Sequence, residues 1–290
     1  MRRTIGVNTW VWTSPLTDER LGEIAATAAG MGFGALELPV EQPGDWSTDA
    51  AREVLDRHGM APIVVGAMAP GRNLVAAPAS EVVATQNYLV HCIGVAEALG
   101  ASVVAGPFTA ATGRTWRMSA EEREQAYRDL RTALAPVVRT AERSGIRLAV
   151  EPLNRYETSL VNTVDQALDA LGPLLGPGLG LALDSYHLNI EERDIGGAIR
   201  HAGEHLAHVQ VCGNDRGAVG DDHIDWPAFL DALDDAGYAG PLGLESFTND
   251  NETIAVAASV WRPLADSQDA LAERSIRHLD ALQEQRETHP

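Results

Sequence analysis

The sequence contains no lysine, so every basic side chain is an arginine or a histidine. Without a lysine amine the chain cannot form a Schiff base, which excludes lysine-dependent aldolases and enzymes that carry pyridoxal phosphate. The lysine that usually grips a phosphate group is missing as well, although arginine and helix N-termini can still bind phosphate.

Cysteine and positive charge are also scarce. The two cysteines, Cys92 and Cys212, are too few for a disulfide framework. The 41 acidic residues outnumber the 22 arginines, which gives a formal net charge of −19. Nucleic acids and anionic membranes bind basic surfaces, so neither is an expected partner. No apolar run could span a bilayer, and the first residues lack the apolar segment of a signal peptide, so we expect a cytoplasmic protein.

Short apolar runs alternate with helical patterns along the 290 residues. Eight of these runs are typical of strands buried on both faces. They cover residues 5–10, 35–38, 61–65, 102–105, 146–150, 179–183, 206–211 and 241–244. The helices expected between and after them cover residues 18–29, 48–58, 79–99, 119–144, 164–171, 195–201, 227–236 and 268–282.

Eight strand-then-helix units favour an α/β fold with a single (β/α)8 TIM barrel. A doubly wound open sheet is the alternative, but the first strand is not followed by the glycine-rich turn of a dinucleotide-binding sheet. No internal linker interrupts the chain, so we expect one domain over residues 1–290.

Acidic residues end three of the expected strands. Glu151, Asp184 and Glu245 each stand directly after an apolar run. In a parallel barrel the C-terminal ends of the strands meet on one face, where enzymes of this architecture place their active sites. Converging carboxylates raise each other's pKa unless a cation lies between them. The pattern therefore predicts a divalent metal site, and carboxylate ligands favour Mn²⁺, Mg²⁺ or Co²⁺.

The seventh expected strand carries two polar residues where a buried strand should be apolar. His208 and Gln210 are two positions apart, so they point to the same side of the sheet. Gln210 can offer its carbonyl oxygen to a hard cation, with His208 as a partner of the ligands or of the substrate. The reverse assignment, with His208 as the ligand, is equally consistent with the spacing.

Three more polar residues follow the metal candidates closely. Glu157 lies in the loop after the first carboxylate, His187 follows the second, and Arg216 lies in the loop after the seventh strand. Each one alone would be interpreted as a solvated loop side chain. Because all three come shortly after a metal candidate, we expect them to contact the substrate, with His208 as a fourth candidate.

These motifs resemble those of the xylose isomerase-like barrels and, within them, the tagatose and allulose (ketose) 3-epimerases. The matching segments are Glu151-Pro-Leu-Asn-Arg-Tyr-Glu157, Leu183-Asp184-Ser-Tyr-His187-Leu-Asn-Ile-Glu-Glu192, Gly213-Asn-Asp-Arg216-Gly, His223-Ile-Asp-Trp226, Leu244-Glu245-Ser-Phe and Val260-Trp261-Arg262. The resemblance spans nearly the whole chain and is densest from Glu151 to Arg262. It implies that Glu151, Asp184 and Glu245 bind the metal, with Glu151 and Glu245 doubling as acid and base.

The resemblance also implies an activity, which is isomerisation or epimerisation of a sugar by proton transfer through an enediolate that a divalent metal stabilises. Mn²⁺ is the expected metal, with Co²⁺ or Mg²⁺ as alternatives. The expected partners are a small sugar substrate and further copies of the chain in a homodimer or homotetramer. Gln210 is a departure, because the epimerases have a metal-ligating histidine there. A glutamine at this position resembles the hydroxypyruvate-isomerase-like branch.

Rival functions suit the same barrel. One is a metal-dependent lyase or isomerase that acts on keto-sugars or their glycosides, and another is a hydroxypyruvate-isomerase-like enzyme. An endonuclease for abasic DNA shares the fold, but it needs histidines after the third and fourth strands, where this chain has Gly66-Ala67-Met68 and Gly106-Pro107. A barrel that binds sugar without turnover would not need the two opposed carboxylates of Glu151 and Glu245.

Overall fold

The computed structural model describes residues 1–288 of the chain. Eight parallel strands run in sequence order around a closed barrel, and β1 pairs with both β2 and β8. This confirms the predicted (β/α)8 barrel. The strands are β1 (Ile5–Asn8), β2 (Ala35–Val40), β3 (Ala61–Gly66), β4 (Val103–Gly106), β5 (Arg147–Val150), β6 (Leu179–Asp184), β7 (Leu206–Val211) and β8 (Leu242–Leu244).

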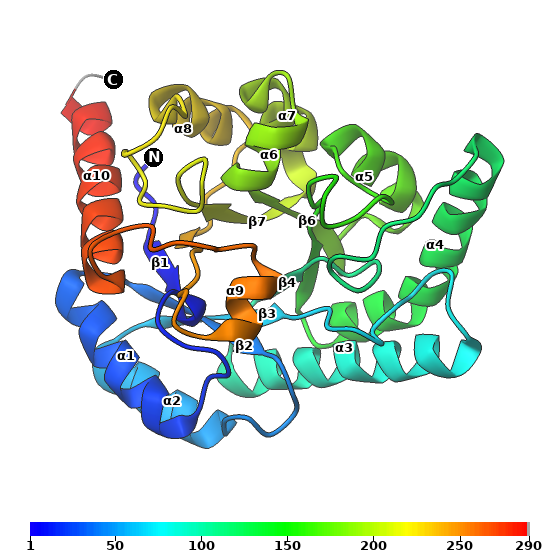
Figure 1. Cartoon of the computed structure of the whole chain (residues 1–290), viewed down its shortest axis with the longest axis horizontal. Helices are drawn as coiled ribbons and strands as arrows, with labels where there is room; N and C mark the ends of the chain where they lie inside the picture. Colours follow the sequence, from blue (N-terminus) through cyan, green and yellow to red (C-terminus); the bar gives the residue numbers. More distant parts are fainter. Residues whose placement is uncertain (289–290) are drawn as a thin grey trace.

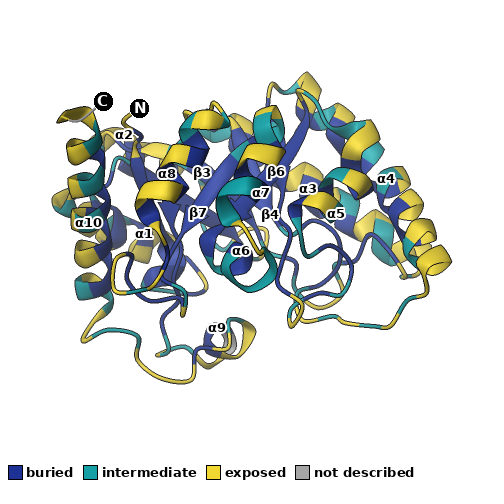
Figure 2. Ribbon diagram, turned by 90° about the horizontal axis from the view of Figure 1, so that it is seen from above, coloured by how far each residue is buried: buried dark blue, intermediate teal, exposed yellow. Residues whose placement is uncertain are grey.

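Helices surround the barrel (Figure 1). The eight that were expected are α1 (Asp18–Met31), α2 (Thr48–His58), α3 (Ala79–Leu99), α4 (Ala120–Arg143), α5 (Val164–Leu171), α7 (Ile195–Ala202), α8 (Trp226–Asp235) and α10 (Gln268–Thr288). Figure 2 shows that the strands are buried while the helices expose their outer faces. Within residues 1–288 none of the helices is long and apolar enough to cross a membrane.

Two short helices differ from the expectation. The first, α6 (Ser185–Glu191), begins directly after Asp184, whose side chain accepts a hydrogen bond from the backbone N–H of Tyr186. The second, α9 (Glu252–Ala257), lies in the long connection after β8. Helices of seven and six residues show too little of the 3.6-residue period to be recognised in a sequence. As a consequence, His187 lies on a helix and not in a loop.

Polar residues at the helix ends explain why these segments become helical. Before α4, Ser119 accepts a hydrogen bond from the N–H of Glu122, and the Glu122 carboxylate accepts one from the N–H of Ser119. These two reciprocal bonds form a capping box. Thr17, Ser47 and Thr163 cap α1, α2 and α5 in the simpler way, through one side-chain oxygen. Each cap stabilises its helix by about 1 kcal/mol.

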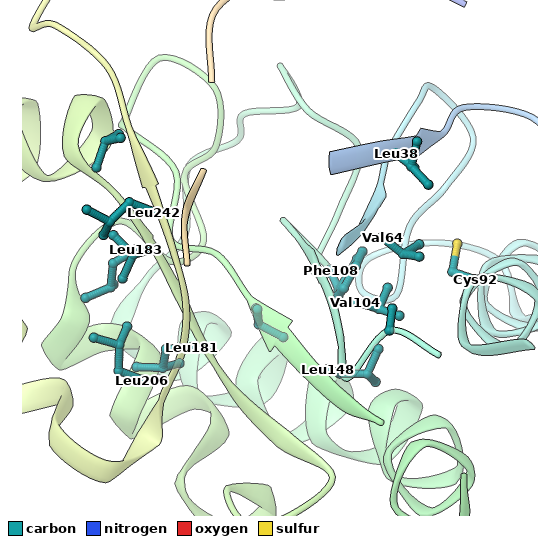
Figure 3. Close-up of a cluster of buried hydrophobic side chains, with 14 of the residues drawn as sticks. Leu38, Val64, Cys92, Val104, Phe108, Leu148, Leu181, Leu183, Leu206 and Leu242 are labelled. Carbon is teal, nitrogen blue, oxygen red and sulfur yellow. The ribbon is translucent and has the colours of Figure 1, made fainter. Parts of the chain in front are cut away.

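The core has two layers, because alternate residues of a strand point to opposite faces of the sheet. The outward layer packs leucine and valine side chains against the helices, and Figure 3 labels Leu38, Val64, Val104, Leu148 and Leu181 of this layer, with Cys92 of α3. The inward layer is built mostly from alanine, with Ala35, Ala105, Ala149 and Ala182 beside Ile63 and Val103. Small inward side chains leave room in the barrel for the polar residues that approach its C-terminal end.

Candidate functional site

Three carboxylates meet at the C-terminal end of the barrel, as expected from the ends of the strands. Glu151 follows β5, Asp184 is the last residue of β6, and Glu245 follows β8. Their exposed fractions are only 7%, 1% and 5%. Donor atoms of Glu151, Asp184 and His187 all lie within 4.8 Å of one another, so these residues form a candidate cation site.

Arg216 places a guanidinium group among these carboxylates. Its Nη1 atom contacts Asp184 and donates to Oε2 of Glu245 at 3.0 Å, while its Nη2 atom lies 3.1 Å from Nε2 of His187. The guanidinium carbon also lies 4.1 Å from the ring centre of Tyr186, which is a cation–π distance. In this structure the positive charge of Arg216 therefore balances negative charge of the carboxylates.

The backbone of Arg216 is anchored in an uncommon conformation. Its φ angle of 68° lies in the left-handed region, which residues with a Cβ atom rarely adopt. The N–H of Arg216 donates to the carbonyl oxygen of Gly213 at 2.9 Å, and its carbonyl oxygen accepts from the hydroxyl of Ser246 at 2.6 Å. Because Ser246 follows Glu245, these bonds tie the loop after β7 to the end of β8. The guanidinium can then move only through its side-chain torsions.

The polar residues of β7 point into the barrel and meet a carboxylate that the sequence analysis did not identify. Glu37 on β2 is fully buried. Its carboxylate accepts hydrogen bonds from Nε2 of His208 at 2.8 Å, from Nε2 of Gln210 at 2.8 Å and from Nδ2 of Asn8 at 2.9 Å. Nε2 of Gln210 also donates to Oε1 of Glu245 at 2.7 Å. Gln210 therefore reaches the carboxylates of the site, while His208 contacts Glu37.

This geometry bears on the alternatives for the seventh strand. The ring of His208 is buried and bonded to Glu37. Among residues 1–288, His208 does not line the cavity described below. The position suits a residue that supports the ligands, and the expected contact between His208 and a substrate finds no geometric support. A signal for Glu37 was present in the sequence, because a charged residue in the apolar run 35–38 needs a buried polar partner.

Asn154 connects two of the predicted substrate-binding residues. Its backbone N–H donates to Nδ1 of His187 at 3.0 Å, and its side-chain Nδ2 donates to Oε1 of Glu157 at 2.7 Å. Nε2 of the same ring lies 3.5 Å from Oε1 of Glu151 and 3.1 Å from Nη2 of Arg216, so both ring nitrogens face a donor. The structure therefore brings His187 and Glu157 together beside Glu151. Nothing in the spacing pointed to Asn154.

Burial changes the protonation of these residues. It raises the pKa of Glu151 well above its ordinary value, with a further increase from the charges of Glu245 and Asp184. It also raises the pKa of Glu245 to about 8, although Arg216 opposes this shift. Burial alone would raise the pKa of Asp184 too, but Arg216, His187 and the hydrogen bond from the N–H of Tyr186 together outweigh it and lower that pKa. Burial and then Arg216 lower the pKa of His187 to about 3, so the ring is neutral at pH 7.

A cavity of about 240 Å³ opens onto the site. Its polar lining includes Glu151, Glu157, His187, Arg216 and Glu245. Its apolar lining includes Trp10, Val65, Met68, Leu153, Phe247 and Ile254, and the last of these belongs to α9. A concave site with few polar groups among apolar walls is the usual form of a small-molecule site. Both expected acid–base residues and three of the four residues expected to bind the substrate therefore line the cavity.

The residues present are suited to a divalent cation. Oε1 of Glu151 is buried and has no hydrogen-bond partner among residues 1–288, and a carboxylate oxygen is rarely left that way. Oxygens of Asp184 and Glu245 converge on one nitrogen of Arg216, and Gln210 adds an amide group beside them. Carboxylate and amide oxygens are the donors that hard divalent cations prefer. Such a cation would have to share these carboxylates with Arg216 or displace it.

Comparisons with known proteins agree with this geometry. Residues 25–282 match the xylose isomerase-like TIM barrel family. The chain is 31% identical over 275 residues to an L-ribulose 3-epimerase of Mesorhizobium japonicum, with 93% of this chain and 91% of the relative covered. The structure is similar to that of an L-ribulose 3-epimerase, with a TM-score of 0.89, 28% identity and coverage of 99% and 98% of the two chains. It is also similar to D-allulose 3-epimerase from Methylomonas sp. in complex with D-allulose, with a TM-score of 0.88, 25% identity and 97% of each chain covered.

The relatives are named as epimerases, which bears out the prediction of an isomerase-class enzyme. The match over residues 25–282 covers the strand ends that carry the site. Both the family model and the full-length relative confirm the resemblance seen in the sequence motifs. The chain belongs to the xylose isomerase-like TIM barrel family.

Proposed function

We propose that this chain is a divalent-metal-dependent ketose 3-epimerase in which Glu151 and Glu245 exchange a proton with the carbon next to the ketose carbonyl. One observation above all supports this function. Both carboxylates are buried and line the same cavity, next to Arg216 and His187. The similarity to L-ribulose and D-allulose 3-epimerases over nearly the whole chain supports it as well.

The cavity offers the hydrogen-bonding groups that a sugar requires. Arg216 can donate to sugar oxygens, His187 offers Nε2 of its ring to a sugar hydroxyl, and the carboxyl group of Glu157 can accept from a hydroxyl. Asn154 holds Glu157 and His187 in place through a hydrogen bond to each side chain. We assign Glu157, His187 and Arg216 to substrate binding, in agreement with their positions in the sequence motifs.

Glu151, Asp184, Gln210 and Glu245 would hold the cation, and Mn²⁺ is our first choice ahead of Co²⁺ and Mg²⁺. When bound, a divalent cation polarises a carbonyl group and stabilises the negative charge of an enediolate. Glu151 and Glu245 carry out the proton transfers. One of them removes the proton from one face of the carbon, and the other, in its acid form, delivers a proton to the opposite face. The product is the epimer, and the two carboxyl groups have exchanged protonation states, ready for the reverse reaction.

A second function has one observation in its favour. The apolar lining of the cavity, which includes Trp10, Met68 and Ile254, offers a surface on which a hydrophobic aglycone could pack. This favours, as an alternative, an isomerase or lyase that acts on the glycoside of a keto-sugar. The same proton abstraction would begin both reactions, so the products must distinguish them.

Proton exchange in D₂O tests the proposed function. The protein is loaded with Mn²⁺, Co²⁺ or Mg²⁺, incubated with ketoses, keto-sugar glycosides and hydroxypyruvate, and followed by proton NMR. We expect deuterium at C3 of a ketose together with the C3 epimer. Glu151→Gln and Glu245→Gln should each slow epimerisation by about 100-fold or more. Glu124→Gln, on the exposed surface of α4, is the matched control and should keep the parent rate.

The alternatives give different products. An aldose, or deuterium at C1, would identify an isomerase, and release of the aglycone would identify a lyase. Absence of exchange with every substrate, in protein that binds the metal, would contradict the proposed function.

A further inference from the structure

The amide of Gln210 lies between two carboxylates. Its Nε2 atom donates to Oε2 of Glu37 at 2.8 Å and to Oε1 of Glu245 at 2.7 Å. Oε2 of Glu37 accepts from Nδ2 of Asn8 as well, so this oxygen acts as an acceptor and the end of the Gln210 amide that faces it is the nitrogen. The nitrogen must therefore face the two carboxylates, and the carbonyl oxygen must face the other way.

Glu37 is rigidly placed to impose this orientation. Oε1 of its carboxylate lies 2.8 Å from Nε2 of His208, and Oε2 also accepts from Asn8 at 2.9 Å. The barrel makes room for it at Gly243 on β8, where a Cβ atom would lie 1.7 Å from Oε1 of Glu37. Gly243 is paired in register with Gln210, so the carboxylate of Glu37 passes over β8 beside the amide that it holds.

We propose that Glu37 is a positioning residue that holds the nitrogen of the Gln210 amide, so that the carbonyl oxygen is the end left to bind the cation. This inference depends on the proposed function, because it concerns the cation of that site. The carbonyl oxygen of an amide binds a cation, whereas its NH2 group repels one. A rotation of 180° about the last side-chain bond exchanges these two groups. Glu245 alone could not fix the rotation reliably, since in the proposed function it binds the cation and transfers protons. Glu37 does neither and lies outside the cavity lining, so it can hold the amide throughout the reaction.

Calorimetric titration with Mn²⁺ alone, without substrate, tests this role. The proteins are the parent, Glu37→Gln, Gln210→Met and the double variant. Glu37→Gln has almost the same shape but only one acceptor oxygen for three donors, and Gln210→Met keeps the length of the side chain without the amide. We expect Glu37→Gln to weaken Mn²⁺ binding by about 10- to 100-fold, as is typical for partners of metal ligands. In the Gln210→Met background the same change should have no further effect, because Glu37 acts through Gln210.

Asn8→Ser is the matched control. It removes another hydrogen bond to the same oxygen of Glu37 but leaves the bond to Gln210, and a serine can still accept from the N–H of Trp10. It should lower stability without changing Mn²⁺ affinity, whereas a merely structural network would make the two variants alike. If Glu37→Gln does not fold, Glu37→Asp withdraws the same carboxylate and should weaken binding in the same way.

The outcomes separate this inference from the proposed function. Parent-like affinity in the Glu37 variant, or a loss that adds fully to that of Gln210→Met, would overturn the positioning role alone. Failure of the parent protein to bind Mn²⁺, Co²⁺ or Mg²⁺ would overturn both.

Discussion

Arg216 and Glu245 form a buried ion pair, with 3.0 Å between Nη1 and Oε2, at the place where the proposed function puts a divalent cation. The same Nη1 atom also contacts Asp184. A guanidinium and a metal ion that use the same carboxylates must compete, because each would repel the other at this distance. The chain thus carries its own counter-charge for the metal-free site, and this counter-charge has measurable effects.

Removal of the metal by a chelator is expected to leave the protein folded. Arg216 then balances Asp184 and Glu245, so the site does not collapse through repulsion between carboxylates. Mass action alone should add about 2.7 kcal/mol of stability at a Mn²⁺ concentration 100 times Kd. Urea unfolding followed by circular dichroism, in EDTA and in a Mn²⁺ series, measures this difference. A chain that is unfolded in EDTA without urea would show that Arg216 does not act as a counter-charge.

Arg216→Met is expected to have opposite effects on the two states. It should destabilise the metal-free protein by about 3 kcal/mol, because it leaves buried carboxylates without their partner. It should also bind Mn²⁺ more tightly, since the competing cation is gone. Urea unfolding in EDTA measures the first effect, and calorimetric titration with Mn²⁺ measures the second.

The matched control for this substitution is Arg274→Met. Arg274 pairs with Asp221 on the surface, and their side chains are 48% and 52% exposed. Pairs of this kind contribute little to stability, so neither measurement should change. Weaker Mn²⁺ binding in Arg216→Met would mean that the guanidinium supports the cation site instead of competing for it.

Much of the barrel could be predicted because each strand is a short apolar run with its own local signal. The carboxylates Glu151, Asp184 and Glu245 could be predicted to converge because parallel strands bring their C-terminal ends together. The helix caps could be recognised for a similar reason, since Ser119 and Glu122 are only three positions apart. Local patterns and one rule of topology therefore account for the fold and for the outline of the site.

The contacts inside the site depend on register and side-chain torsions, which leave no local pattern. Glu37 and His208 are 171 positions apart and meet only because the barrel closes. The sequence shows that both are polar residues in buried strands, but it does not show that one holds the other. In the same way, Arg216 could be expected near the cavity, while its contact with Asp184 follows from a left-handed backbone that no sequence rule indicates for an arginine.

His187 is expected to make the metal-free protein sensitive to acid. Its pKa in the folded protein is lowered to about 3 from an ordinary value of 6.5, chiefly by burial. Folding therefore favours the neutral ring, and this contribution to stability is present above pH 6.5 and is lost as the pH falls toward 3. His187→Gln, which does not titrate, should lose less stability than the parent over this range. Urea midpoints in EDTA at several pH values measure the difference.

The comparison isolates His187 because the other titrating groups are common to both proteins. Glu151 and Glu245 have raised pKa values, so their contribution is lost as the pH rises, which is the opposite direction. His201→Gln is the control, since His201 is exposed on α7 beside Asp165. Parallel pH profiles for the parent and His187→Gln would contradict a neutral, buried ring.

Glu151→Gln and Glu245→Gln should each lose proton exchange with a different epimer if Glu151 and Glu245 act on opposite faces of the substrate carbon. Each epimer then loses its proton to a different carboxylate. In Glu245→Gln, the epimer served by Glu151 can still lose its proton and regain a deuteron on the same face, so it exchanges without inversion. Glu151→Gln should show the same behaviour with the other epimer. Epimerisation itself should fall by about 100-fold or more in both.

Proton NMR of each pure epimer in D₂O measures these exchanges separately. Both variants must be studied at saturating Mn²⁺, because each substitution also replaces a proposed metal ligand with a weaker one. Exchange of one epimer in one variant and of the other epimer in its counterpart assigns a face to each carboxylate. Loss of exchange from the same epimer in both variants would mean that one carboxylate performs the proton transfer and that the other acts only in binding. In that case a single base remains on one face of the carbon, which produces an isomer by returning the proton to the neighbouring carbon and cannot produce an epimer.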